Sequence, residues 1–122
     1  IRVSGLSSYG TSKKVALKVA NSPLVKTAAY GEDPNWGRII TAAGNAGVKE
    51  FDMKKLSLKI GNYPVLINGN LNPKYTEAKG KKEFRKKTIN IEIKFGKAKQ
   101  SALVMTSDLS PEYISINSDY RS

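Results

Sequence analysis

The side chains of this sequence that could take part in chemistry lie in a central stretch and in the C-terminal tail. In the central stretch Glu32 and Asp33 are adjacent carboxylates, and Arg38 follows about one helical turn after Asp33. Adjacent side chains usually diverge, so these two carboxylates are not expected to act as a pair. Asp33 is better explained as a helix cap, and Arg38 as a partner in a structural ion pair, with Asp33 or with a neighbouring loop.

The C-terminal tail carries a denser set of polar groups. Asn117 and Ser122 bring an amide and a hydroxyl, and an α-carboxylate with a pKa of about 3.3–3.7 adds a negative charge at neutral pH. A docked tail with these groups could hold a small molecule that carries an ammonium group. Tyr120 and Arg121 favour docking because such side chains tend to be anchored, whereas physical chemistry alone favours a frayed chain end.

The composition excludes several kinds of site. The chain has no Cys and no His, which excludes disulfides, thiolate nucleophiles and a Ser-His-Asp triad. Without either residue type a zinc site is not expected. The sequence also lacks the G-x-x-x-x-G-K-[ST], G-x-G-x-x-G and G-x-S-x-G motifs. We therefore find no self-contained catalytic set in these 122 residues.

Two capped helices with a tight corner between them are predicted for residues 22–44. Ser22 and Asp33 each precede a proline, and a capping side chain followed by proline is typical of a helix start. Gly31 is expected to end the first helix in the left-handed conformation. The second helix has an apolar stripe at helical spacing, which consists of Trp36, Ile39, Ile40 and Ala43.

The remaining pattern predicts one α/β domain over residues 1–122. We expect further helices at about 12–21 (capped by Thr11 or Ser12), 73–86 (capped by Asn72) and 111–117, and strands at 1–3, 56–60, 65–67, 89–95 and 100–106. The predicted fold class is therefore α/β, a short mixed or antiparallel sheet with packed helices.

The formal net charge of +11 is large for this length, and residues 79–87 hold the most basic run. One explanation is a free-standing basic module that binds nucleic acid or an acidic membrane surface. The other is a solvated, lysine-rich surface or a fragment whose other half is acidic, and the scarcity of aromatic residues among the lysines favours it. No apolar run approaches the roughly 20 residues of a membrane span, and no signal-peptide pattern is present.

Two stretches resemble the ornithine acetyltransferase (glutamate N-acetyltransferase) family of arginine biosynthesis. The first runs from NSPLVKTA at residues 21–28 into GEDPNWGRI at residues 31–39, and the second is residues 107–122, in register with the family's C-terminus. Residues 1–5 fit the strand that precedes the first helix of the family. The match is weak over residues 48–103, and Met105 and the turn at 96–99 depart from the family pattern.

The resemblance implies an N-terminal-nucleophile-type fold in an enzyme that cleaves itself into two chains. In this family a Thr at the start of the second chain takes the acetyl group from N2-acetylornithine and passes it to glutamate, which is covalent catalysis with an oxyanion hole. On this basis we expect the sequence to be the C-terminal segment of the second chain. The nucleophile would lie upstream, so the segment alone would be inactive.

The resemblance assigns two site residues, Asn117 and Ser122, to substrate binding, and so predicts that the tail docks into the active site. Asp33, Trp36 and Arg38 become scaffold residues near that site. No catalytic residue, metal or cofactor is implied for this segment, and the use of acetyl-CoA as a second acetyl donor is left open. The implied partners are the upstream part of the enzyme, N2-acetylornithine and glutamate, in the cytoplasm or an organelle matrix, without membrane or nucleic acid.

Overall fold

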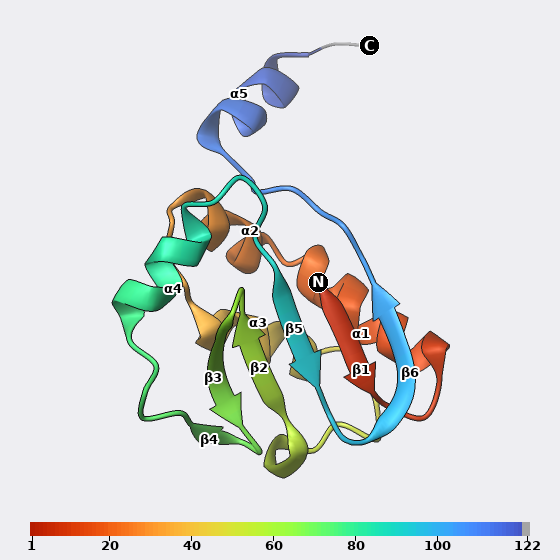
Figure 1. The fold of residues 1–122 in the computed structure, drawn as a ribbon. Helices are drawn as coiled ribbons and strands as arrows, with labels where there is room; N and C mark the ends of the chain where they lie inside the picture. Colours follow the sequence, from red (N-terminus) through yellow and green to blue (C-terminus); the bar gives the residue numbers. More distant parts are fainter. Residues whose placement is uncertain (121–122) are drawn as a thin grey trace.

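The computed structural model describes residues 1–120, and its centre is a six-stranded mixed sheet (Figure 1). The strand order is β4-β3-β2-β5-β1-β6, with β1 and β5 parallel and all other neighbours antiparallel. The strands are β1 (Arg2–Gly5), β2 (Ser57–Ile60), β3 (Tyr63–Ile67), β4 (Asn70–Leu71), β5 (Ile91–Lys94) and β6 (Ala98–Leu103). The predicted α/β class is confirmed, and of the two sheet types expected, mixed or antiparallel, the sheet is mixed.

Five α-helices and one 3-10 turn complete the part of the chain that the structure describes. They are α1 (Tyr9–Ala20), α2 (Pro23–Tyr30), α3 (Trp36–Gly44), the 3-10 turn Met53–Lys55, α4 (Glu77–Phe84) and α5 (Pro111–Asp119). In Figure 1, α1 and α3 lie behind the sheet, and α5 stands apart from it. Within residues 1–120, no helix has the length and apolar character needed to cross a bilayer.

The sheet buries one face and leaves the other polar, because successive side chains of a strand point to opposite faces. One row across the central strands, Leu58, Ile93 and Val3, is almost fully buried. It packs in the same cluster as Val15 of α1 and Ile39 of α3. Burial of each such aliphatic side chain contributes about 1.5–3 kcal/mol, so this cluster supplies the main stabilisation of the fold.

The corner between α2 and α3 differs from the prediction in two ways. Gly31 has φ −77°, and the left-handed residue is Glu32, with φ 55°. The Glu32 N–H donates to the Ala29 carbonyl, and the Asp33 N–H donates to the Ala28 carbonyl. This is the Schellman pattern with its left-handed position one residue later than expected.

Asp33 is also not the N-cap of α3. Asn35 takes that position, and its Oδ1 accepts a hydrogen bond from the Arg38 N–H at 3.2 Å. Asp33 contributes to the cap indirectly, because its Oδ2 accepts a hydrogen bond from Asn35 Nδ2 at 3.2 Å. The side chain that caps α3 is therefore itself oriented by Asp33.

The predicted helix at 73–86 begins later than expected. Asn72 and Pro73 belong to a turn, in which Asn72 Oδ1 accepts from the Lys74 N–H and Asn72 Nδ2 donates to the Pro64 carbonyl. Thr76 caps α4 instead, accepting a hydrogen bond from the Lys79 N–H. The first helix differs in the opposite direction. It begins earlier than expected, with Ser8 as its cap.

Helix α4 is anchored by Phe84 and by a buried carboxylate, Glu83. Lys86 Nζ lies 2.6 Å from Glu83 Oε2, and this hydrogen bond holds the pKa of Glu83 below its ordinary value of 4.5. A carboxylate with a lowered folded-state pKa stabilises the fold above its unfolded-state pKa. That contribution is lost as the pH falls through the folded-state pKa.

We therefore expect the wild-type chain to be more stable than the E83Q variant at neutral pH. The difference in unfolding free energy should stay constant above pH 4.5, the ordinary value, and shrink at lower pH. Urea denaturation of both proteins between about pH 3 and pH 7 measures it. An equal loss of stability on acidification in both proteins would contradict the role assigned to Glu83.

Candidate functional site

The central stretch around Asp33 and Trp36 lines a depression in the part of the chain that the structure describes. This depression has a volume of about 500 Å³ and lies where the α2–α3 corner meets β4 and the start of α4. Its lining residues are Asp33, Pro34, Asn35, Trp36, Gly37, Leu71, Tyr75 and Glu77. The structure thus brings Asp33 and Trp36 together at one concave surface, and it adds Tyr75 and Glu77, which the sequence did not single out.

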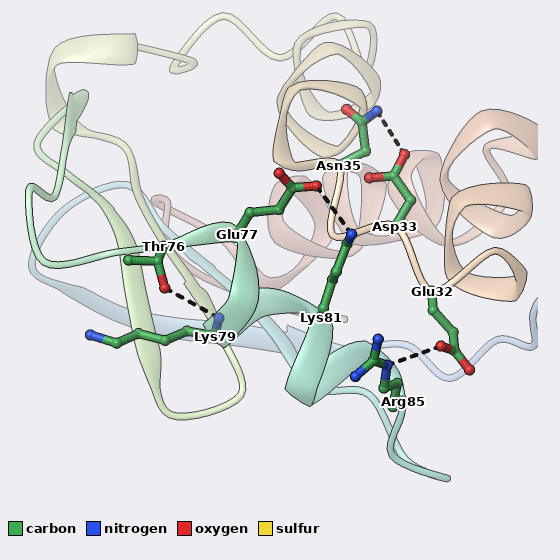
Figure 2. Close-up of polar contacts among 8 residues, drawn as sticks. All are labelled: Glu32, Asp33, Asn35, Thr76, Glu77, Lys79, Lys81 and Arg85. Atoms are coloured by element: carbon green, nitrogen blue, oxygen red, sulfur yellow. Dashed lines mark hydrogen bonds and ion pairs between the residues drawn. The ribbon is translucent and has the colours of Figure 1, made fainter.

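The carboxylates around this depression are already paired (Figure 2). Asp33 is bonded to Asn35, and Glu77 Oε1 lies 3.8 Å from Lys81 Nζ within α4. Glu32 Oε2 accepts a hydrogen bond from Arg85 Nε at 3.1 Å and so ties the corner to the end of α4. Among residues 1–120 no cluster of three or more acidic side chains gathers to hold a metal ion. These carboxylates therefore act as scaffold.

Tyr75 is the exception among the polar groups of the depression. Its hydroxyl oxygen is buried and has no hydrogen-bond partner within the described part of the chain. Burial raises the pKa of Tyr75, and the nearby carboxylates of Glu77 and Asp33 raise it further. Gly80 of α4 allows this close packing, since a Cβ at that position would overlap the Tyr75 hydroxyl and lie 2.7 Å from the Pro34 Cβ.

The Y75F variant is expected to be more stable than the wild type by about 1 kcal/mol, because a buried hydroxyl without a partner costs about 1–3 kcal/mol. Thermal and urea denaturation of both proteins check this value. F84Y offers a matched comparison, because it adds a hydroxyl at a buried site and should destabilise the fold. A loss of stability in Y75F would contradict the absence of a hydrogen-bond partner for Tyr75.

Arg38 ties α3 to α2 through a hydrogen bond and not through the predicted ion pair. Arg38 Nη1 donates to the Leu24 carbonyl at 3.0 Å. None of the ion pairs between described residues includes Arg38. Its structural role is therefore kept, whereas Asp33, the expected partner, is used by Asn35.

The basic run of α4 is partly neutralised by its own surroundings. Lys81, Arg85 and Lys86 each pair with a glutamate, and Lys79 Nζ donates to the Lys74 carbonyl. This pairing weakens the case for a nucleic-acid patch on α4. The nucleic-acid alternative stays a prediction, and binding that falls by several decades between about 50 and 200 mM salt would support it.

Among the described residues, Asn117 makes no hydrogen bond to the body of the chain. Asn117 is exposed on α5, and its Nδ2 donates to the Tyr113 carbonyl of the same helix at 2.8 Å. Helix α5 has no buried residue. Ser122, the second predicted substrate-binding residue, lies outside the described residues. Asn117, the described residue of the predicted tail site, is not among the residues that line the depression at Asp33 and Trp36.

Comparison with known proteins decides the family. A profile of the ArgJ family matches residues 1–122. The chain belongs to the ArgJ family. This confirms the resemblance to the arginine-biosynthesis acetyltransferases that the motifs indicated. The profile match covers the whole chain, including residues 48–103, where the resemblance is weak.

Relatives and a solved structure agree with this assignment. The chain is 42% identical to the arginine biosynthesis bifunctional protein ArgJ of Agrobacterium fabrum and 44% identical to that of Bartonella henselae, over 122 residues in both cases. It spans 29% and 30% of those proteins. The crystal structure of ArgJ from Bacillus halodurans superposes with a TM-score of 0.90 and 28% sequence identity. The match covers 98% of this chain and 55% of the Bacillus halodurans chain. The ArgJ fold of this segment is therefore established.

Proposed function

We propose that this chain is the C-terminal segment of an ArgJ acetyltransferase that moves the acetyl group from N2-acetylornithine to glutamate. The observation that carries the proposal is the ArgJ match over all 122 residues at about 29% of the relatives' length. In the proposed reaction a Thr hydroxyl outside this segment attacks the acetyl carbonyl, and ornithine leaves as the free amine. The glutamate amine then attacks the acyl-threonine ester and releases N-acetylglutamate and the Thr.

In this proposal the body of the chain is scaffold. The corner at Glu32, Asp33 and Asn35 is fixed by hydrogen bonds to α3 and α4. Such a rigid corner suits a structural element that holds neighbouring parts of the enzyme in position. The sequence contains no self-contained catalytic motif, so the catalytic Thr and the oxyanion hole are assigned to the rest of the enzyme.

The tail supplies the substrate-binding groups, Asn117 and Ser122. Helix α5 supports a docked position in the assembled enzyme because Tyr113, Ile114 and Ile116 are each more than half exposed. A detached helix of this length is marginal in water and gains most of its stability from packing of an apolar face. The rest of the enzyme is the surface that we propose for α5, and docking would bring the Asn117 amide to the substrate.

The composition of the purified protein tests the proposal. We expect the chain to co-purify from its source with a polypeptide that carries an N-terminal Thr, or to be continuous with one. Intact-mass analysis and N-terminal sequencing of the purified material distinguish these cases. A chain that purifies alone, with its mass accounted for by the 122 residues, would refute the transferase function for this molecule.

A further inference from the structure

We propose that another depression, formed within the described residues, is a binding site for a small molecule that carries phosphate or polyphosphate. We call it the second depression. It has a volume of about 490 Å³ and lies at the end of the sheet where β5 ends and β2 begins, the lower end in Figure 1. Its lining residues are Lys55, Ser57, Asn68, Lys94, Gly96 and Lys97. Three lysines, one hydroxyl and one amide therefore share one concave surface, and none of the lining residues is acidic.

The strand register explains why positive charge accumulates here. Two rows of side chains cross the polar face of the sheet on β1, β5 and β2. In one row Glu92 lies between Arg2 and Lys59, so its carboxylate stands beside two cations. In the next row Lys94 lies between Ser4 and Ser57, and no carboxylate stands beside it. Lys94 therefore has no carboxylate directly opposite it on β1 or β2, and Glu92, two residues away on the same face, stands beside two other cations.

The other lysines of the depression are also without ion-pair partners. None of the ion pairs between described residues includes Lys55, Lys94 or Lys97. The carboxylate nearest to Lys94 in sequence is Glu92, which stands between Arg2 and Lys59. Those nearest to Lys55 take part in other hydrogen bonds. Asp52 accepts a hydrogen bond from the Lys54 N–H, and Glu50 accepts two from Ser7. An anion would therefore supply the missing countercharge.

The backbone of the depression is held in place before any ligand arrives. The Gly69 N–H donates to the Leu56 carbonyl at 2.7 Å, and the Phe95 N–H donates to the Ser4 carbonyl at 2.9 Å. Leu56 and Phe95, which follow Lys55 and Lys94, are buried. Ligand binding then orders mainly the lysine side chains, which lowers the entropic cost.

The class of ligand follows from the donors. A lysine ammonium group acts as a point charge for phosphate oxygens, and three of them around one depression match an anion of several negative charges better than a single carboxylate. The Ser57 hydroxyl already accepts from the Asn68 N–H, which leaves its own proton to donate. The Asn68 side-chain amide adds another donor. The site is separate from the proposed acetyl transfer and does not depend on it.

Calorimetric titration of the purified protein that contains these residues with inorganic pyrophosphate tests the proposal. We expect saturable binding at one site, and binding of acetate that is at least about tenfold weaker, because a monoanion engages fewer ammonium groups. The site variant K55Q/K94Q/K97Q is expected to lose about tenfold or more in affinity for pyrophosphate. The control variant K14Q/K49Q/K87Q loses the same charge from exposed positions outside the depression, and its affinity should stay within about twofold of the wild type.

Two results would overturn the proposal. One is an equal loss of affinity in the site and control variants, which would mean attraction by net charge alone. The other is the absence of saturable pyrophosphate binding by the wild type. If the site variant does not fold, amide chemical-shift mapping on the wild-type chain still tests the proposal. The largest shift changes on pyrophosphate addition are expected at Ser57, Asn68 and Gly96. Shifts spread over all exposed lysines would count against the site.

Discussion

Gly5→Ala is expected to destabilise the fold by about 2–5 kcal/mol. Gly5 ends β1 with φ +86°, a left-handed conformation that costs an L-residue about 1–2 kcal/mol. A Cβ there would also overlap the backbone of the 95–96 turn, at 2.8 Å from both the Gly96 carbonyl oxygen and the Phe95 nitrogen. Such overpacking against backbone costs about 1–3 kcal/mol more. Urea denaturation followed by circular dichroism measures the loss.

Gly47→Ala is the matched control for that substitution. Gly47 has φ +69°, but a Cβ there would meet no atom within 4 Å. Only the backbone strain of about 1–2 kcal/mol is therefore expected. If G5A and G47A lost the same stability, the close packing of β1 against the 95–96 turn would be refuted.

Asn117→Ala is expected to raise the KM for N2-acetylornithine or glutamate by about 10- to 100-fold in an assembled enzyme, because loss of a hydrogen bond to a charged substrate costs about 1.5–3 kcal/mol. A suitable enzyme is the Agrobacterium fabrum relative with its matching 122 residues replaced by this chain. Steady-state acetyl-transfer kinetics give KM and kcat.

The fold itself should tolerate the loss of Asn117. Its side chain is exposed, and within residues 1–120 it bonds only to its own helix, at the Tyr113 carbonyl. S115A, at an exposed position on the same helix, should leave the kinetics within about twofold of the parent. S122A should weaken substrate binding in the same way as N117A. Unchanged kinetics in both N117A and S122A would remove the tail from the proposed substrate site.

The sequence predicted correctly those helices and strands whose ends depend on residues close by in the chain. Ser22 and Ser110 cap helices that begin at the following proline, as expected. The apolar stripe of α3 faces the core, with Ile39 and Ala43 buried. The strand around Ile93 alternates as predicted. In each case the deciding interactions lie within a few residues.

The same cap-and-proline signal failed at Asn72 and at Asp33. Asn72 bonds to the Pro64 carbonyl of β3, so its side chain is used in a turn and not for a helix start. Asp33 orients Asn35, because the Schellman ending of α2 carries the chain one step further before α3 begins. The Asn72 contact depends on the path of β3, and the Asp33 contact, although local, depends on the left-handed conformation that Glu32 takes in place of Gly31.

The candidate sites were predictable only in part, for the same reason. The motif around Asp33 and Trp36 was visible, but Tyr75 joins it from a segment about 40 residues further along the chain. The lysines of the second depression come from the 3-10 turn, β5 and the following turn. Only the strand order brings those segments together, and strand order is not read from local patterns.

Acetyl transfer by the chimeric Agrobacterium fabrum enzyme is the most direct test of the proposed function. The assay follows the formation of N-acetylglutamate from N2-acetylornithine and glutamate, with the unmodified relative as the positive control. We predict turnover by the chimera and none by the 122-residue chain alone. A folded chimera that forms no N-acetylglutamate, beside an active unmodified relative, would contradict the proposal that this chain is a working segment of an ArgJ acetyltransferase.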